Sequence, residues 1–337
     1  MNLQKLTDAE IQDKRVLLRL DLDVDDDFTR IELAKDTIDI LKKNRCRIIV
    51  IGHKGRPGGK VDKKYSLERL VPVIEKASAL QVDFCEEVIG DKAKNACDDL
   101  TPDKILLLEN LRFYPGEENG DPEFVKALAS LGEFYVNEAF ANCHREHASI
   151  VGLPKVLPHA AGIRLQKEVE VLSGILESPK RPVVAVVSGV KEDKMERIAE
   201  ISDKVDKILI GGRLPMYYGD ENPDSQKIIM ARLIPDTLDI TIHSIERFKK
   251  EIVVAGTIIL AGVPGKYEDE GHRQGTKEVF AAIADSNAYK VAGGGDAEAA
   301  ITLLGLNEKF DWISVGGGSF LQFLAKGTLP GIDTLLK

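Results

Sequence analysis

The chain has 337 residues, of which 43% are hydrophobic and 30% charged, and its formal net charge is -9 at pH 7. This length exceeds what one compact core usually supports and suggests two domains, while the composition excludes a disordered chain and a fibrous repeat. The negative charge argues against nucleic acid or an anionic membrane as the main partner, because both require a basic surface.

The sequence carries no feature of export or membrane insertion. No apolar run follows a positive head at the N-terminus, and eighteen consecutive apolar residues occur nowhere, so we expect a cytoplasmic protein. The cysteines are too scattered for a zinc site and too few for a disulfide framework, which predicts reduced thiols at Cys46, Cys85, Cys97 and Cys143. We interpret Cys143 as a packing residue, with a nucleophile as the alternative.

Short β-branched runs alternate with segments of helical length, which is typical of parallel strands buried on both faces. In the first half the predicted strands are 16–20, 47–51, 82–84, 105–108 and 134–136. In the second half they are 183–187, 207–210, 227–230, 257–260, 290–292 and 312–314. The pattern predicts an α/β fold of two doubly wound parallel sheets, Rossmann-like in type.

The best candidate for a domain boundary lies between these two sets of strands. Apolar residues at 163, 169, 172 and 176 fit one face of a helix, which Pro179 and Pro182 would prevent from continuing. We predict an N-terminal lobe at 1–160, a hinge helix and linker at 161–182, a C-terminal lobe at 183–320 and a tail at 321–337. Since ligands of such sheets bind at the carboxyl ends of the strands, the cleft between the lobes is the expected site.

Basic side chains follow several predicted strands of the first half. They are Arg30, His53, Arg56, Arg112, His144, Arg145 and His147. A guanidinium is a planar fork of donors that suits phosphate and carboxylate oxygens, so converging arginines indicate a pocket for a small polyanion. The glycines of the loop 52–59 would let backbone amides approach that anion. A surface ion pair is the alternative interpretation of each arginine taken alone.

Glycine runs follow four predicted strands of the second half, at 189, 211–212, 293–295 and 316–318. A glycine run between a strand and a helix points free amides and the positive end of the helix dipole at one place, which suits a phosphate. Asp296 is a candidate ligand for Mg²⁺ carried by a nucleotide, and Lys191 is a candidate partner of a phosphoryl group in transfer. Tight turns alone are the alternative explanation of each run.

These residues, in this order, resemble the phosphoglycerate kinase family over nearly the whole chain. In the first half the matching motifs are 19–24, 29–31, 53–57, 107–113, 136–140 and 144–149. In the second half they are 203–207, 275–277, 293–296 and 316–318. So many separate motifs in one order make coincidence a poor explanation.

The resemblance implies reversible phosphoryl transfer between 1,3-bisphosphoglycerate and ADP, giving 3-phosphoglycerate and ATP, with Mg²⁺ bound to the nucleotide. By position, the triose-acid site of the family corresponds to Asp21, Asp23, Arg30, His53, Arg56, Arg112 and Arg145. Its nucleotide site corresponds to Gly189, Lys191, Lys194, Gly211, Gly212, Glu268, Gly293, Gly294, Gly295 and Asp296, with Glu268 toward the ribose. Arg30, Lys191, Gly295 and Gly317 would stabilise the group in transfer, and the tail at 329–332 would return to the first lobe.

The chain also departs from the family. Asp23 stands where the family usually has asparagine, which places a carboxylate near an anionic substrate. Around the expected base pocket, Arg213, Lys266 and Ala297 replace family residues, and the stretch 216–240 is much shorter than in the family. We expect a reduced nucleotide lobe, loose selectivity for the base, and either stacking of the two cations on the base or their exposure to solvent.

Two other functions remain to be compared with the kinase. A silent protein of the same fold could sense a triose phosphate with its first lobe. A doubly wound dehydrogenase would need a dinucleotide fingerprint at a strand-to-helix junction, which this sequence lacks. We expect a monomer that binds small molecules and binds neither nucleic acid nor a membrane.

Overall fold

A computed structural model describes residues 1–192, 194–218 and 226–337. The chain divides into two compact units. Unit 1 comprises Met1–Glu170 together with Leu329–Lys337, and unit 2 comprises Val171–Thr328. The first division falls inside the long helix α8 (Ile163–Glu177), which therefore belongs in part to each unit. The lobe limits expected from the sequence stay a prediction.

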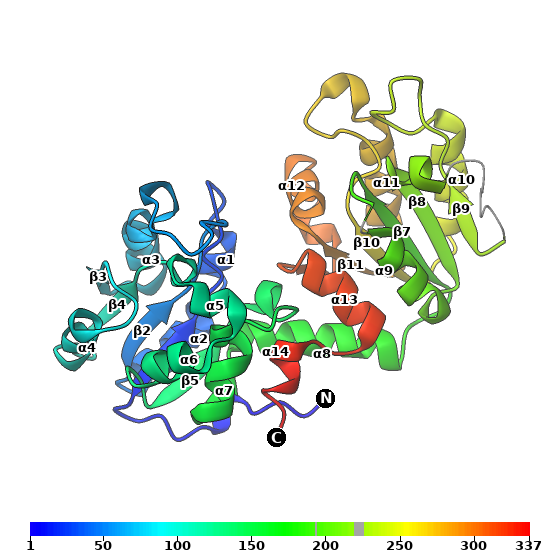
Figure 1. The fold of residues 1–337 in the computed structure, drawn as a ribbon. Helices are drawn as coiled ribbons and strands as arrows, with labels where there is room; N and C mark the ends of the chain where they lie inside the picture. Colours follow the sequence, from blue (N-terminus) through cyan, green and yellow to red (C-terminus); the bar gives the residue numbers. More distant parts are fainter. Residues whose placement is uncertain (193, 219–225) are drawn as a thin grey trace. The chain divides into compact units, whose positions relative to one another are not determined.

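Unit 1 is built on one six-stranded parallel sheet with the order β3-β4-β2-β1-β5-β6. The strands are β1 (Arg15–Arg19), β2 (Arg47–Ile51), β3 (Gln81–Cys85), β4 (Lys104–Leu108), β5 (Phe134–Asn137) and β6 (His159–Ala161). Its helices are α1 (Thr29–Glu32), α2 (Lys35–Lys43), α3 (Val71–Ser78), α4 (Asp91–Asp98), α5 (Pro115–Asn119), α6 (Pro122–Ala129), α7 (Leu153–Val156) and α14 (Pro330–Asp333). Figure 1 shows helices on both faces of this sheet.

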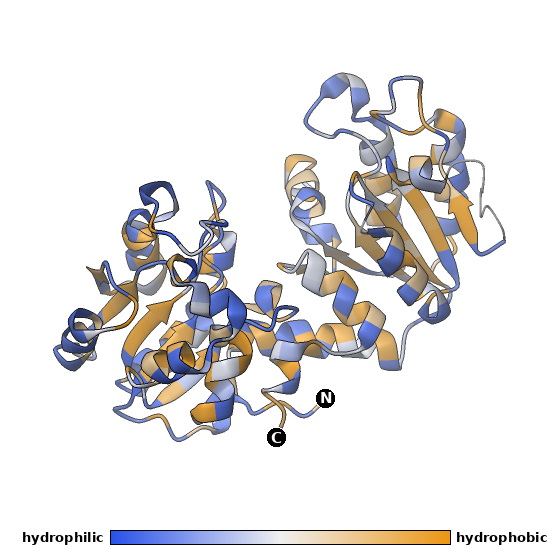
Figure 2. Cartoon of the chain, viewed as in Figure 1, coloured by the Kyte–Doolittle hydropathy of each residue, from blue (hydrophilic) through white to orange (hydrophobic). Residues whose placement is uncertain are grey.

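The core of unit 1 explains why its strands read as continuous apolar runs. Val16, Ile48 and Phe134 are register partners across β1, β2 and β5, and all three are buried. Helices cover both faces, so each strand buries successive residues, and the strands are the most apolar parts of the ribbon (Figure 2). The five strands predicted for the first half are present. The prediction missed β6, because His159–Ala161 is three residues long and contains no β-branched residue.

Unit 2 repeats this architecture with the strand order β12-β11-β10-β7-β8-β9, again entirely parallel. The strands are β7 (Val183–Gly189), β8 (Lys207–Gly212), β9 (Ile228–Met230), β10 (Thr257–Ala261), β11 (Tyr289–Gly293) and β12 (Trp312–Ser314). The helices are α9 (Lys194–Ile201), α10 (Ile242–Ile252), α11 (Gln274–Asp285), α12 (Gly295–Leu303) and α13 (Gly318–Lys326). All six strands predicted for this half are present, and the predicted α/β class is confirmed.

Both sheets contain a point at which the chain changes direction across the sheet. In unit 1 the chain places β2 beside β1, continues to β3 at the edge of the sheet, adds β4 between β3 and β2, and then returns to place β5 on the other side of β1. In unit 2 it builds from β7 through β8 and β9 and then returns to add β10 beside β7. Doubly wound sheets bind ligands beside the carboxyl ends of such strand pairs. Each unit therefore has one edge at which ligand binding is expected.

The last nine residues complete unit 1. Leu329, Ile332 and Leu335 are buried, and the amide of Gly331 donates to the carbonyl of Cys143 over 2.8 Å. Gly331 leaves no room for a side chain, because a Cβ there would lie 2.6 Å from Ile150. Across the described ranges 1–192, 194–218 and 226–337, no helix has the length and hydropathy needed to cross a membrane.

Candidate functional site

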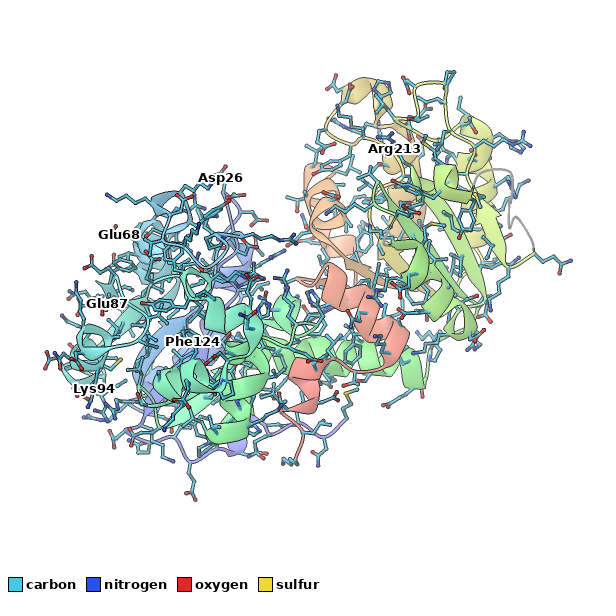
Figure 3. The ribbon with its side chains drawn as sticks, viewed as in Figure 1. Asp26, Glu68, Glu87, Lys94, Phe124 and Arg213 are labelled. Carbon is cyan, nitrogen blue, oxygen red and sulfur yellow. The ribbon has the colours of Figure 1, made fainter. Side chains whose placement is uncertain are left out.

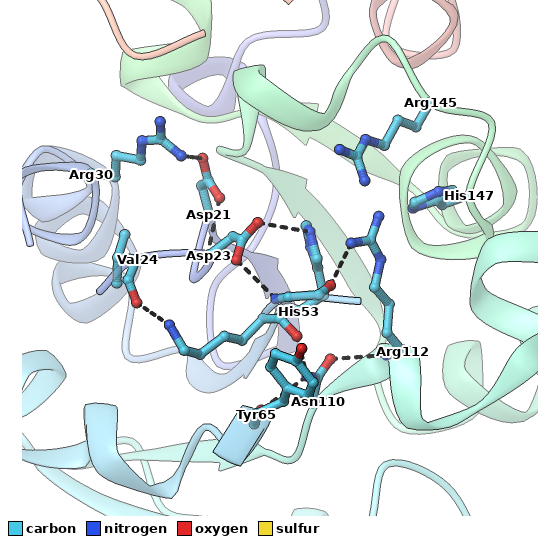
Figure 4. A network of polar contacts seen from close by, with 12 residues as sticks. Asp21, Asp23, Val24, Arg30, His53, Tyr65, Asn110, Arg112, Arg145 and His147 are labelled. Carbon is cyan, nitrogen blue, oxygen red and sulfur yellow. Dashed lines mark hydrogen bonds and ion pairs between the residues drawn. The ribbon is translucent and has the colours of Figure 1, made fainter. Parts of the chain in front are cut away.

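The carboxyl edge of the unit 1 sheet gathers the basic residues that the sequence singles out. Arg30 lies on α1 after β1, His53 and Arg56 follow β2, Arg112 follows β4, and Arg145 follows β5. Figure 4 shows Arg30, His53, Arg112 and Arg145 around one space. Burial, and next the charge of Arg56, lowers the pKa of Arg145, which places these two guanidiniums close to each other. The arrangement is a pocket with an excess of positive charge.

Two aspartates at the end of β1 shape this pocket. The Asp21 carboxylate is buried and accepts a hydrogen bond from Arg30 over 2.9 Å. Asp23 is not paired with an arginine: one oxygen accepts the amide of Gly55 over 2.8 Å, and the other lies 3.9 Å from Nε2 of His53. The carboxylate at position 23 is therefore turned toward the loop 52–59 (Figure 4).

His53 is the residue of unit 1 whose contacts most clearly indicate a ligand-binding site. Its ring is buried, and Nδ1 lies 2.8 Å from the guanidinium of Arg19. Because a guanidinium can only donate, Nδ1 must accept, and the proton of the neutral ring lies on Nε2. Burial and the nearby charge of Arg19 hold the pKa of His53 well below its usual value, which keeps the ring neutral. Nε2 is buried and has no hydrogen-bond partner among the described residues, so it is a donor available to a bound anion.

A buried network fixes Arg19 in place. Nε of Arg19 donates to Oγ of Ser149 over 2.9 Å, and Oγ of Ser149 donates to the carboxylate of Glu117 over 2.6 Å. Glu117 also accepts the amide of Ser149 over 2.9 Å, and the hydroxyl of Tyr135 donates to the carbonyl of Ser149 over 2.6 Å. Ser149 thus stands between a buried cation and a buried anion, which makes both charges tolerable in the interior.

Sequence reasoning missed Arg19, Glu117 and Ser149 as parts of the site, although Arg19 and Ser149 lie in motifs that it quoted. Arg19 follows three apolar residues at the end of β1, and a charged residue in a run buried on both faces needs an internal partner. That signal could have identified Arg19. Glu117 lies on a short helix among other charged residues, and nothing in its local sequence distinguishes it.

The side chain of Arg112 is held by a backbone carbonyl as well as by a carboxylate. It is buried, it donates to the carbonyl of Gly55 over 2.6 Å, and its Nε lies 3.2 Å from Glu118. Its own amide donates to the side chain of Asn110, whose Nδ2 donates to the carbonyl of Lys54. The loops after β2 and β4 are therefore tied together, and the guanidinium is oriented before any ligand arrives.

In unit 2 the ammonium of Lys194 lies where β7 and β10 end. Its Nζ donates to the carbonyl of Ser188 over 2.6 Å. A Cβ at Gly189 would lie 2.9 Å from this nitrogen, and a Cβ at Gly262 would lie 2.8 Å from it. A side chain at either glycine would crowd the ammonium, and at Gly262 it would also lie 2.1 Å from the backbone carbonyl oxygen of Ser188. The structure thus brings Gly189 and Lys194 together, while their assignment to a nucleotide stays a prediction.

The N-termini of two helices lie close together at the carboxyl ends of β11 and β12. Gly294 precedes α12 and Gly317 precedes α13, and neither helix has a side-chain cap. A Cβ on Gly317 would lie 3.6 Å from Cα of Gly294, while a Cβ on Gly294 or Gly295 would meet nothing within 4 Å. The first-turn amides of both helices are therefore accessible from the same side, which suits a phosphate chain.

Several other predicted side chains of unit 2 are exposed. They are Lys191, Glu268 and Asp296, together with Arg213 and Lys266 of the expected base pocket. Gly211 and Gly212 end β8, where the amide of Gly212 donates to the carbonyl of Pro264. Arg213 lies at the surface (Figure 3), and both alternatives for this cation, stacking on the base or exposure to solvent, stay predictions. Part of the stretch 216–240, expected to be shortened, lies outside the described residues.

Known proteins match this chain along its length. A family model described as phosphoglycerate kinase matches residues 6–222 and 219–327. The two matches meet at 219–222, inside the stretch that we predict to be shortened. A relative named phosphoglycerate kinase from Coprothermobacter proteolyticus is 36% identical over 391 residues, covering 100% of this chain and 99% of the relative. A relative of the same name from Brucella melitensis is 35% identical, with full coverage of both chains.

Solved structures give the same result. The phosphoglycerate kinase of Coxiella burnetii matches with a TM-score of 0.82 and 27% identity, and that of Pyrococcus horikoshii with a TM-score of 0.87 and 25% identity. In both cases 99% of this chain and 98% of the solved chain are covered. Combined with the basic pocket of unit 1 and the glycine-rich edge of unit 2, these matches show that the chain belongs to the phosphoglycerate kinase family.

Proposed function

We propose that the chain catalyses phosphoryl transfer between 1,3-bisphosphoglycerate and ADP, with the triose acid bound by unit 1 and the nucleotide by unit 2. The observation that carries this proposal is the unpartnered Nε2 of His53, buried among arginines. A neutral donor surrounded by fixed positive charge suits a carboxylate or phosphate oxygen. The relatives give no support to the alternative of a silent sensor.

In unit 1 we assign the binding of the triose acid to Arg30, Arg56, Arg112, Arg145 and His53. Arg56 is exposed and has no hydrogen bond or ion pair within the described part of the chain, so its donors are available to a ligand. Arg30 keeps its pairing with Asp21, which leaves its remaining donors for the substrate. Asp21 therefore acts as a positioning residue. Asp23 lies beside His53 and, with a phosphate nearby, would oppose binding unless it stays turned to Gly55.

In unit 2 we assign the phosphates of the nucleotide to the amides of Gly295 and Gly317 and to Lys194 and Lys191. The helix dipoles of α12 and α13 add positive potential at the same place. Among the residues described, no group of three or more His, Cys, Asp or Glu could hold a metal ion. Asp296 alone fits an Mg²⁺ ion that arrives with the phosphates and neutralises part of their charge, since Mg²⁺ usually takes one or two carboxylates plus phosphate oxygens.

The reaction asks the protein for positioning and charge stabilisation. The bond between phosphorus and the carboxylate oxygen of the acyl phosphate breaks, and a bond to a terminal oxygen of ADP forms in line with it. Both the attacking and the leaving oxygen are anionic, so no general base is required. Arg30, Lys191 and the helix amides would stabilise the negative charge on the group in transfer.

A coupled assay of ATP formation from 1,3-bisphosphoglycerate and ADP tests the activity, and Lys191→Ala tests the assignment. Lys191 has no hydrogen bond or ion pair from its side chain to the described residues, so it is free to act on the substrate. We expect kcat of Lys191→Ala to fall about 100- to 1000-fold with little change in KM. Lys309→Ala, at an exposed lysine of the same unit, is the matched control. Wild-type protein that forms no ATP would leave the sensor as the better account.

A further inference from the structure

The ring of His272 lies between two carboxylates. Nδ1 lies 2.8 Å from Asp269 and Nε2 lies 2.9 Å from Asp236. A neutral imidazole has a single N–H, so one of these contacts would place a ring lone pair against a carboxylate oxygen. The imidazolium donates at both nitrogens and satisfies both contacts. The geometry therefore fits a charged histidine.

These contacts join two loops that are far apart in the sequence. Asp236 belongs to the loop 231–241 between β9 and α10, whereas Asp269 and His272 belong to the loop 262–273 between β10 and α11. Figure 1 shows both loops at the same end of unit 2. The amide of Lys266 also donates to the carbonyl of Leu238 over 2.8 Å, which adds a backbone tie between them.

A buried aspartate completes the joint beneath His272. Asp239 accepts the amide of Ile240 over 2.7 Å and the amide of Gly275, in the first turn of α11, over 2.8 Å. A Cβ on Gly265 would lie 2.1 Å from the Asp239 carboxylate, and a Cβ on Gly275 would lie 2.2 Å from it. Two glycines are thus required for the close approach. The loop 231–241 is therefore held in two ways: Asp236 contacts His272, and the buried Asp239 accepts the amide of Gly275.

The loop 262–273 reaches the edge at which we assign the phosphates. Its Pro264 carbonyl accepts the amide of Gly212 over 3.1 Å. Burial, and next the charges of Glu268 and Asp296, raise the pKa of Tyr267. Because Asp296 is in the first turn of α12, the loop 262–273 also lies near the start of that helix. Glu268 is the residue expected at the ribose. Any movement of this loop would therefore move the nucleoside end of the proposed site.

We propose that Asp236, protonated His272 and Asp269 form a clasp that positions the loop 262–273, with Glu268, for the nucleoside of the bound nucleotide. The inference rests on the proposed function of unit 2. The clasp lies at the end of the stretch 216–240, which we predict to be shorter than in the family. It ties the loop 231–241 to the loop 262–273.

The clasp should respond to pH in one direction. Hydrogen bonds first to Asp269 and then to Asp236 raise the pKa of His272. The hydrogen bond with His272 is the main cause that lowers the pKa of Asp269, whereas the pKa of Asp236 is lowered first by the amide of Leu238 and then by His272. The other charged groups nearby are Asp239 beneath the ring and Lys266 beside Asp269. A raised pKa means that the clasp is complete below about pH 6.5, the unfolded value, and is lost as pH rises through the folded value.

Calorimetric titration of the wild type and of His272→Gln with MgADP, between pH 6.5 and 9.5, tests the clasp. We expect His272→Gln to raise Kd about two- to fivefold at pH 6.5 and to match the wild type at pH 9.5. His243→Gln, at an exposed histidine of α10, should keep the wild-type Kd throughout. Asp236→Asn should weaken binding as His272→Gln does, and 3-phosphoglycerate affinity should stay unchanged in every variant.

Two readouts separate failure of the clasp from failure of the proposed function. Nitrogen-15 NMR of the histidine rings, assigned with His272→Gln, should show both His272 nitrogens protonated at pH 6.5. A neutral ring at that pH would overturn the clasp. Wild-type protein that does not bind MgADP would overturn the proposed function, and the positioning role with it. Normal MgADP binding that His272→Gln leaves unchanged at every pH would overturn the positioning role alone.

Discussion

At the level of single residues, the pocket of unit 1 combines fixed and free cations. Arg19 and Arg112 are buried and held by internal hydrogen bonds, whereas Arg56 is exposed. Arg19 sets the tautomer of His53. Because both arginines are already held in place, little side-chain entropy is lost when they bind a ligand. The side chain of Arg56 would be ordered only when the substrate binds. Its contribution should therefore appear in the affinity for 3-phosphoglycerate.

Arg56→Ala is expected to weaken 3-phosphoglycerate binding about 10- to 100-fold, because a hydrogen bond to a charged group contributes about 1.5–3 kcal/mol. Calorimetric titration measures this. Arg45→Ala removes an exposed arginine that pairs with Asp13 elsewhere in unit 1, and it should leave the affinity unchanged. Equal affinity of Arg56→Ala and wild type would remove Arg56 from the pocket.

His147 makes the stability of unit 1 sensitive to acid. Burial, and next the charges of Arg145 and Arg19, lower the pKa of His147 to about 4 from an ordinary value of 6.5. Between these values the unfolded chain binds more protons than the folded chain, so stability falls as pH drops from about 6.5 to 4. The full effect is about 3 kcal/mol. Burial of His53 acts in the same direction, while Glu138, whose pKa is raised to about 7, acts in the opposite one.

Urea unfolding of the wild type and of His147→Gln at pH 7, 6 and 5 isolates this contribution, because Glu138 and His53 are common to both proteins. We expect the variant to lose less stability than the wild type as pH falls. His243→Gln should follow the wild-type curve. A variant whose stability declines as steeply as that of the wild type would contradict the buried, neutral state of His147.

At the level of elements, the start of α8 is held by side chains from other parts of unit 1. Glu138, directly after β5, accepts the amides of Arg164 and Leu165 over 3.1 and 3.2 Å. The hydroxyl of Thr37 on α2 donates to Glu138 over 2.6 Å and accepts the amide of Ile163 over 2.8 Å. Amides of the first helical turn are thus satisfied by Glu138 and Thr37, and the carboxyl group of Glu138 lies at the positive end of the helix.

Thr37→Val keeps the shape of the side chain and removes both hydrogen bonds. The amide of Ile163 then loses its partner, and Glu138 loses one donor. We expect a loss of about 1–3 kcal/mol in the free energy of unfolding, the usual cost of an unsatisfied buried group. Chemical denaturation measures it. Thr37→Ser retains the hydroxyl and should keep most of the stability, and equal losses in both variants would attribute the effect to packing instead.

At the level of the whole molecule, the chain begins and ends in the same unit. The amide of Gln4 donates to the carbonyl of Leu335 over 2.9 Å, and Leu3 pairs with Leu336 in an antiparallel bridge. Unit 2 is therefore inserted, in sequence, between Glu170 and Leu329 of unit 1. The stability of unit 1 therefore depends on residues that follow unit 2 in the sequence.

Ile332→Ala is expected to destabilise unit 1 by about 2–5 kcal/mol, because the side chain is fully buried and its loss leaves a cavity. Amide hydrogen exchange should show faster exchange in residues 1–170 than in the wild type and unchanged exchange in residues 171–328. Leu336→Ala, at a side chain that is 40% exposed, is the control and should have a small effect. Faster exchange in both units would mean that the tail supports more than unit 1.

The sequence alone determined the fold class, the family and eleven of the twelve strands found in the described part of the chain, and the comparisons confirm the family and its kinase function. These follow from local signals: apolar runs of strand length, helical periodicity, and glycines or basic residues directly after strands. The strand β6 was missed because its residues carry no such signal. The positions of the predicted basic residues at one sheet edge follow from parallel topology, which the local pattern already implies.

Only the tertiary structure decided which polar groups meet. Arg30 pairs with Asp21 rather than with Asp23, and Arg19 reaches Glu117 through Ser149, 130 positions from Arg19. His272 finds Asp236 across 36 positions. A buried polar group must find a partner, but the chain offers many candidates at similar sequence distances. Packing of distant elements selects among them, and that selection has no periodicity from which it could be predicted.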